Sequence, residues 1–145
     1  MIPAAPDSIG PLRRELRRFA RSHGAPASVQ SAVALAFSEA CTGIVRLNAR
    51  ARGSRGARGP LSVEATVRDD ELHLRVSHRD RAIPLTADMM GYGLSLALIS
   101  QLTDRFEIRR RDDGPGTALE MVFALGASPT PARSGAAAPA VRRRR

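Results

Sequence analysis

A short glycine-containing segment, Gly91-Tyr92-Gly93, stands directly before a run of helix-forming residues that includes Leu94 and Leu98. Glycine allows the backbone to approach a ligand closely, because it has no Cβ. The first turn of the following helix offers unpaired N–H groups and the positive end of the helix dipole. This combination is suited to binding an anion, although an ordinary loop before a core helix has the same pattern.

A second residue with chemical potential is Glu39. It lies in a helical pattern over about residues 28–50, beside an apolar stripe formed by Val29, Val33, Ala36, Ala40, Ile44 and Leu47. A half-buried carboxylate needs a hydrogen-bonding partner or a chemical task, since burying an unpaired charge is costly. Gly43 lies one turn later on the same face, where it weakens the helix by roughly 1 kcal/mol relative to alanine.

The elements that must position these residues follow from hydrophobic periodicity. Helical spacing predicts two further helices, over about residues 8–24 and 93–102. Alternation of apolar and polar residues predicts two hairpins, with strands at 61–68, 72–77, 104–110 and 117–125. This grouping predicts an α+β fold, a two-layer sandwich with three helices on one face of an antiparallel or mixed sheet of about four to five strands.

Three other conspicuous features have ordinary structural explanations. His73 falls on the outward side of its strand, so we expect it to be exposed to solvent. Cys41, the single cysteine, lies among apolar helical positions and is expected to be a small buried residue. The N-terminal helix carries arginines opposite an apolar stripe, which is typical of a surface helix, although such a helix can also lie on a membrane or bind a partner.

The formal net charge of +9 is concentrated in two segments that contain no acidic residue. Four arginines lie in the glycine-rich segment 50–60, and five lie in the tail 126–145, which ends in Arg142, Arg143, Arg144 and Arg145. The other 14 arginines balance the 14 carboxylates. We expect disorder in this tail and in residues 1–7, since neither can bury a core, and one folded domain over residues 8–125.

The distribution of apolar residues also predicts where the chain resides. No apolar run approaches the length of about 18 residues that a transmembrane helix needs, and the N-terminus lacks the charged-then-apolar pattern of a secretory leader. We therefore expect a soluble, cytoplasmic protein.

The order of the elements, together with three short motifs, resembles the GHKL ATPase superfamily, which includes gyrase, a heat-shock chaperone, histidine kinases and mismatch-repair ATPases. Within it, the chain looks most like the small bacterial anti-sigma factor serine kinases and their actinobacterial relatives, over roughly residues 8–125.

The motifs imply a role for individual residues. The helix around Glu39 resembles the family's first box, in which a glutamate acts as general base. Gly91-Tyr92-Gly93-Leu94 resembles the glycine box that cradles the phosphates, and Gly114-Pro115-Gly116-Thr117 resembles the final box, whose threonine also reaches phosphate. The phosphate-binding residues implied by this resemblance are Gly91, Tyr92, Gly93, Leu94, Gly116 and Thr117.

The chain departs from the family at the residue that holds magnesium. The asparagine that follows the glutamate by four residues in the family is Gly43 here. Glycine has no side-chain oxygen, and Mg²⁺ requires oxygen ligands in near-octahedral geometry. Asn48 lies on the same helix but faces another direction, so no metal ligand is expected from it.

The box that reads Asp-x-Gly-x-Gly in the family, whose aspartate accepts a hydrogen bond from the adenine amino group, is also changed. If the strand ends early, His78 takes the aspartate position, with Asp80 and Ala82 in place of the glycines. If it runs two residues longer, Asp80 is the adenine acceptor, with Ala82 and Pro84 in place of the glycines. Both registers keep the same strand face, so the sequence leaves them open. In both, added side-chain atoms would crowd the base.

The resemblance implies an ATP-binding, serine/threonine kinase-like regulatory protein of the anti-sigma-factor type. Its implied partners are an anti-anti-sigma (STAS-type) protein and a sigma factor, and the resemblance also allows a homodimer. Because the magnesium ligand and the adenine-box glycines are replaced, we expect ATP binding that is weak or lost, poorly held Mg²⁺, and phosphoryl transfer that is very slow or absent.

Two other functions stay open from the sequence. One is a non-catalytic protein-binding module, a pseudo-kinase that sequesters a transcription regulator. The other is a nucleic-acid accessory protein that uses Arg142, Arg143, Arg144 and Arg145, with binding that would be salt-sensitive and unspecific.

Overall fold

A computed structural model of the 145-residue chain describes residues 2–3, 6–52, 60–78, 93–111 and 116–126. The helices are α1 (Pro6–Ser22), α2 (Ala27–Arg52) and α3 (Gly93–Leu102). The strands are β1 (Ile2–Pro3), β2 (Pro60–Arg68), β3 (Glu71–His78), β4 (Arg105–Arg110) and β5 (Thr117–Ala124).

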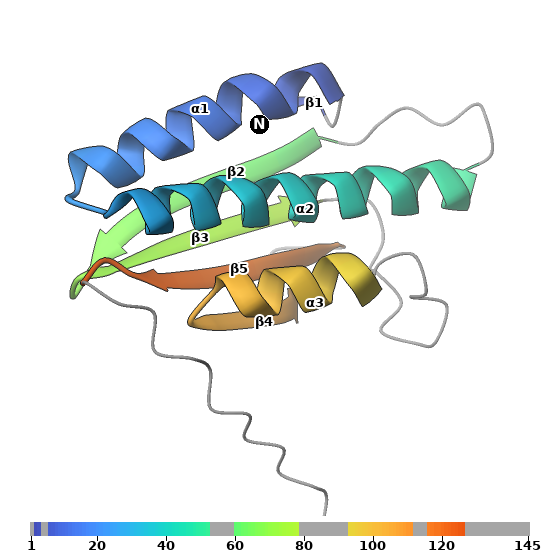
Figure 1. Ribbon diagram of the computed structural model, residues 1–145. Helices are drawn as coiled ribbons and strands as arrows, with labels where there is room; N and C mark the ends of the chain where they lie inside the picture. Colours follow the sequence, from blue (N-terminus) through green and yellow to red (C-terminus); the bar gives the residue numbers. More distant parts are fainter. Residues whose placement is uncertain (1, 4–5, 53–59, 79–92, 112–115, 127–145) are drawn as a thin grey trace, which may run out of the picture.

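The strands form one five-stranded sheet in the order β1-β2-β3-β5-β4, and all neighbouring pairs are antiparallel. The three helices form a single layer on one face of this sheet (Figure 1). The predicted two-layer α+β sandwich is therefore confirmed, and each predicted helix and strand lies within a few residues of its expected position.

The hairpin between β2 and β3 shows how local sequence sets the register. Asp69 and Asp70 both have positive φ, at 49° and 60°, and they connect the facing residues Arg68 and Glu71. A two-residue loop with two left-handed residues matches the twist of the adjoining strands, and aspartate tolerates this conformation better than most residues. The register that follows brings Leu72, Leu74 and Val76 onto the helix-facing side of β3.

Helix α2 lies in the middle of the helical layer, where it contacts α1 on one side and α3 on the other (Figure 1). This position explains why more of its surface is buried than one stripe predicts. Phe37 and Cys41 are buried, in addition to the predicted stripe residues Val33, Ala36, Ala40 and Ile44. Val29 is partly buried, and the side chain of Leu47 lies outside the described part of the structure.

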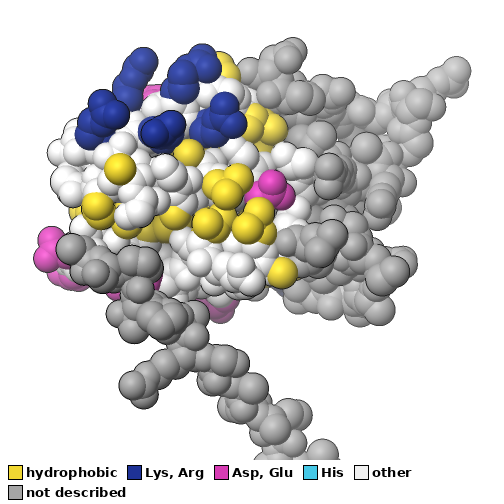
Figure 2. Space-filling model, in the orientation of Figure 1, with side chains coloured by type: hydrophobic (Ala, Val, Ile, Leu, Met, Phe, Trp, Pro, Cys, Tyr) yellow, Lys and Arg dark blue, Asp and Glu magenta, His cyan; other side chains and the backbone are white. Residues whose placement is uncertain are grey.

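Helix α1 lies at one edge of the helical layer, beside α2, and presents a basic outer face (Figure 1). Leu16 and Ala20 are buried, whereas the arginine side chains of the opposite face are exposed. These are Arg13, Arg14, Arg17, Arg18 and Arg21, which form the row of basic residues in Figure 2. The helix is thus a surface helix, as its periodicity predicts. In the described part of the chain, no helix is long and apolar enough to cross a membrane.

The two edge strands of the sheet, β1 and β4, differ in length and composition. Ile2 and Pro3 pair with Leu61 and Pro60, so the N-terminal residues include a short strand, and α1 begins at Pro6 and not at Ser8 as expected. The opposite edge is β4, whose sequence RFEIRR carries Arg105, Glu107 and Arg109 on the outward face and Phe106 and Ile108 on the face toward the helical layer.

Cys41 is fully buried, which confirms its interpretation as a small core residue. Removal of the thiol from water disfavours the charged thiolate. Burial accordingly raises the pKa of Cys41 to about 12, from a usual value of 9.0.

This raised pKa predicts a loss of stability in alkaline solution. Above about pH 9 the thiol of the unfolded chain ionises, whereas the folded thiol stays protonated until about pH 12, so rising pH lowers the free energy of the unfolded state relative to the folded state. We expect the free energy of unfolding, measured by urea titration, to fall by about 1 kcal/mol per pH unit in this window. The Cys41→Ala chain should lack this component, and an equal fall in both chains would contradict the assignment.

Candidate functional site

Glu39 and the beginning of α3 lie in direct contact. The Ser95 hydroxyl donates a hydrogen bond to Glu39 Oε2 at 2.9 Å, and these two residues are 56 positions apart in the chain. Glu39 is half-buried in the middle of α2, and Ser95, the third residue of α3, is only 5% exposed. The sequence required a partner for this carboxylate, and the partner is a hydroxyl from the neighbouring helix.

The position of this contact along α3 matters for chemistry. Because α3 begins at Gly93, Ser95 lies in the first turn, where the backbone N–H groups have no partner within the helix. The contact therefore brings a carboxylate beside the positive end of a helix dipole. Of the residues predicted to hold phosphate here, Gly93 and Leu94 are the first two residues of α3, and Gly91 and Tyr92 lie outside the described residues.

A second part of the candidate site lies at one end of the sheet. His78, the last residue of β3, faces Thr117, the first residue of β5, and each is 3% exposed. Their pairing continues the register of Val76 with Leu119, whose side chains belong to the core below the helices. The two predicted site residues are thus cross-strand neighbours on the helix-facing side of the sheet.

Gly116 lies directly before Thr117 and makes the close approach of these strands possible. Its φ is +124°, and an added Cβ would lie 1.9 Å from the carbonyl oxygen of His78. No side chain can occupy that space without moving the backbone. Glycine at this position is required by the fold, whatever its contribution to ligand binding.

The end of β3, the beginning of β5 and the beginning of α3 gather at the same end of the molecule (Figure 1). Glu39, Gly93, Gly116, Thr117 and His78 therefore come from elements that adjoin this end or, for α2, pass beside it. Asp80 and Ala82 lie outside the described residues. The described part of β3 ends at His78, so the residues that would decide between the two registers of this box lie outside the described part of the chain.

Sequence reasoning did not identify Ser95. Its signal was weak but present, since Ser95 is the only polar residue in the first half of the apolar segment GLSLALISQL. Only the packing of α3 against α2 shows that this hydroxyl reaches Glu39.

The described residues offer limited means of holding a metal ion. Mg²⁺ in nucleotide sites is commonly held by one or two carboxylates together with phosphate oxygens and water. Glu39, which accepts the hydrogen bond from Ser95, supplies one carboxylate. Gly43, one turn later, is buried and has no side-chain oxygen. Within the described ranges, no three His, Cys, Asp or Glu side chains lie close enough together to form a metal cluster.

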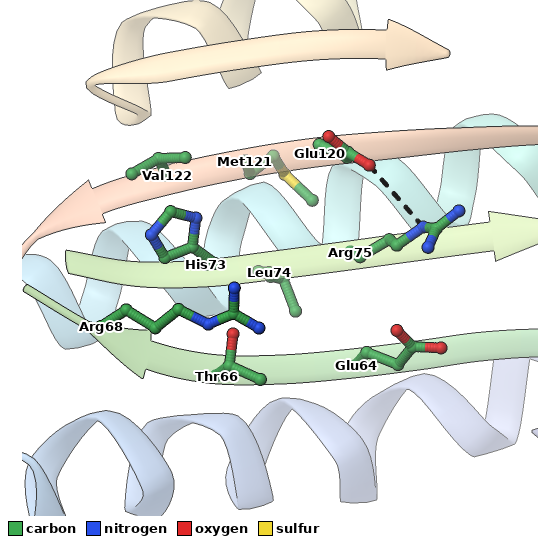
Figure 3. Close-up of a pocket in the computed structure, with 9 residues that line it drawn as sticks. All are labelled: Glu64, Thr66, Arg68, His73, Leu74, Arg75, Glu120, Met121 and Val122. Carbon is green, nitrogen blue, oxygen red and sulfur yellow. Dashed lines mark ion pairs between the residues drawn. The ribbon is translucent and has the colours of Figure 1, made fainter. Parts of the chain in front are cut away.

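A separate hollow of about 350 Å³ lies on the other face of the sheet, away from the helices (Figure 3). It is lined by charged side chains of β2, β3 and β5, including Arg68, His73 and the Arg75–Glu120 ion pair, whose Nε and Oε1 atoms are 3.8 Å apart. The side chain of His73 is 39% exposed there, as the alternation of its strand predicts. The sheet separates this hollow from Glu39 and Ser95, so the two are different sites.

A comparison with known families agrees with this architecture. The sequence profile of the histidine kinase-like ATPase domain matches residues 2–123, which include every described helix and nearly all of the sheet. None of the curated proteins matches the chain. The chain therefore belongs to the histidine kinase-like ATPase domain family, and as a class it is an ATP-binding, kinase-like ATPase domain.

The geometry at Gly116 predicts the effect of one substitution. Gly116→Ala should lower the free energy of unfolding by at least about 2 kcal/mol, because the new Cβ meets the His78 carbonyl and the residue is held at positive φ. Gly126→Ala is the matched control, since no atom lies within 4 Å of its added Cβ. Chemical denaturation of both chains provides the measurement, and equal stabilities would contradict the described approach of β5 to β3.

Proposed function

We propose that this chain is an ATP-binding regulatory domain of the anti-sigma-factor serine/threonine kinase type, whose phosphoryl transfer is weak or lost. We further propose that it acts on a sigma factor and an anti-anti-sigma (STAS-type) protein in a partner switch. The observation that carries the proposal is the hydrogen bond from Ser95 to Glu39, because it puts a carboxylate beside the first turn of a helix that follows a glycine segment.

In this proposal, the two ends of ATP contact different parts of the domain. The N–H groups at the start of α3 and the Gly91-Tyr92-Gly93 segment hold the phosphates, with Thr117 as a further hydroxyl ligand. His78 or Asp80, depending on the register of this box, takes the place of the aspartate that would accept the adenine amino proton.

Glu39 is the proposed general base. It takes the proton of a serine hydroxyl on the partner protein while the γ-phosphoryl group passes to that oxygen and ADP leaves. A general base contributes typically 10²- to 10⁴-fold to such a step. Positioning and neutralisation of charge supply most of the remainder, and the loss of a metal ligand at Gly43 supports slow or absent transfer.

The second candidate function is a protein-binding module that sequesters a transcription regulator without catalysis. Gly43 favours this second candidate because the residue is buried. In this proposal, the loss of a magnesium ligand there slows phosphoryl transfer but leaves the protein-binding surfaces unaffected. The nucleic-acid alternative depends on Arg142 to Arg145, which lie outside the described residues.

Calorimetry with ATP and magnesium separates the two candidates. We expect ATP to bind to the wild-type chain, and to Glu39→Gln within about threefold of the wild-type affinity, because the general base acts on the transferred proton and not on the bound nucleotide. Transfer of labelled phosphate to a STAS-type partner should be lost in Glu39→Gln. A wild-type chain that binds no ATP would contradict the first candidate and favour the sequestering module.

Introducing asparagine at position 43, where the family has that residue, tests whether a magnesium ligand increases phosphoryl transfer. Gly43→Asn should increase magnesium-dependent phosphoryl transfer about tenfold or more, because it supplies an oxygen ligand one turn after Glu39. Gly43→Ala is the matched control, since it adds a side chain at the same buried position without an oxygen. If both variants fold, as judged by circular dichroism, and have equal transfer rates, position 43 does not limit catalysis.

A further inference from the structure

Ser95 differs from three other hydroxyl-bearing residues whose contacts are described: Ser38 in α2, Ser100 in α3, and Thr103 directly after α3. Ser38, Ser100 and Thr103 each donate to a backbone carbonyl three or four residues earlier, at 2.8, 2.8 and 2.9 Å. This local bond is the usual choice of a serine or threonine in a helix. Ser95 instead reaches across to Glu39.

The position of Ser95 in the helix explains this difference. Because α3 begins at Gly93, the residues three and four positions before Ser95 precede the helix, and no carbonyl of the helix itself is available to its hydroxyl. The hydroxyl is also nearly fully buried, so it requires a partner within the protein. The half-buried carboxylate of Glu39 meets this requirement at 2.9 Å.

The bond constrains Glu39 as much as it satisfies Ser95. A glutamate side chain has three rotatable torsions, and a hydrogen bond at one carboxylate oxygen restricts them. With Oε2 bound to Ser95, the carboxylate is held toward the first turn of α3, and Oε1 is not engaged by this bond.

We infer that Ser95 is a positioning residue for Glu39. It orients the carboxylate so that Oε1 can accept a proton from an incoming hydroxyl group, while Oε2 stays bound to the protein. This inference rests on the proposed function, because it assigns Ser95 a role only if Glu39 is the general base.

The kinetic test compares Ser95→Ala, Ser95→Thr and Ser100→Ala in the full chain. Ser100 is a matched control, since it lies on the same helix, is exposed, and donates only to Ala97 in its own helix. We expect Ser95→Ala to lower kcat of ATP-dependent phosphoryl transfer 10- to 100-fold with KM for ATP changed less than about twofold. Ser95→Thr retains a hydroxyl and should recover most of kcat, and Ser100→Ala should equal the wild type.

A double variant separates positioning from other effects. If Ser95 acts through Glu39, the combination of Ser95→Ala with Glu39→Gln should be no slower than Glu39→Gln alone. A further loss equal to that of the single Ser95→Ala change would overturn the inference. Mass spectrometry after incubation with ATP is the complementary measurement, because a phosphoryl group found on Ser95 would make it an acceptor and also overturn the positioning role.

A spectroscopic test works whether or not the wild type turns over. In chains with ¹³C-labelled glutamate, the Glu39 carboxyl signal is the one that disappears in Glu39→Gln. It should shift in Ser95→Ala and return toward its original position in Ser95→Thr, and an unchanged signal in Ser95→Ala would overturn the contact. A wild-type chain that binds no ATP contradicts the proposed function, whereas one that binds ATP without turnover contradicts only the catalytic role of Ser95. An active wild type with equal kcat in Ser95→Ala and Ser100→Ala contradicts the positioning role and leaves the proposed function intact.

Discussion

A half-buried carboxylate in the central helix must be hydrogen-bonded, and this requirement couples α2 to α3. Glu39 lies in the middle of the helix that contacts both other helices, where an unpaired charge would be costly. The Ser95 hydroxyl satisfies it. The same bond therefore contributes to the packing of the helical layer and to the geometry of the candidate site, and the two cannot be changed independently.

Much of the fold could be predicted because its determinants are local. Strict alternation in residues 61–68 and 72–76, joined by Asp69-Asp70, specifies a two-residue hairpin, and the structure has that hairpin. The extent of burial on α2 could not be predicted in the same way. A single stripe follows from periodicity, but burial of Phe37 depends on the flanking helices, which the pattern within α2 does not reveal. Likewise, the pairing of Ile2 with Leu61 joins residues far apart in the chain.

The candidate site was predictable to a similar degree. Glu39 was recognisable because a charged residue stands beside an apolar stripe, and Gly116 because a glycine ends the turn before a strand. Ser95 could be noticed only as a polar residue in an apolar segment, because the pattern within α3 does not reveal the partner of its hydroxyl. Its function in the structure depends on which helix lies opposite, which is a property of the tertiary fold.

The composition of β4 has a consequence for how these molecules behave at high concentration. As the last strand of the sheet, β4 presents one side of its backbone to any extended chain that approaches it. Four of its six residues are charged, and Arg105 and Arg109 form ion pairs with Glu71, Glu107 and Glu120, so a strand that added to this edge would have to accommodate these charged side chains. Charged side chains on an edge strand disfavour pairing with another chain, so this edge is protected against extension of the sheet.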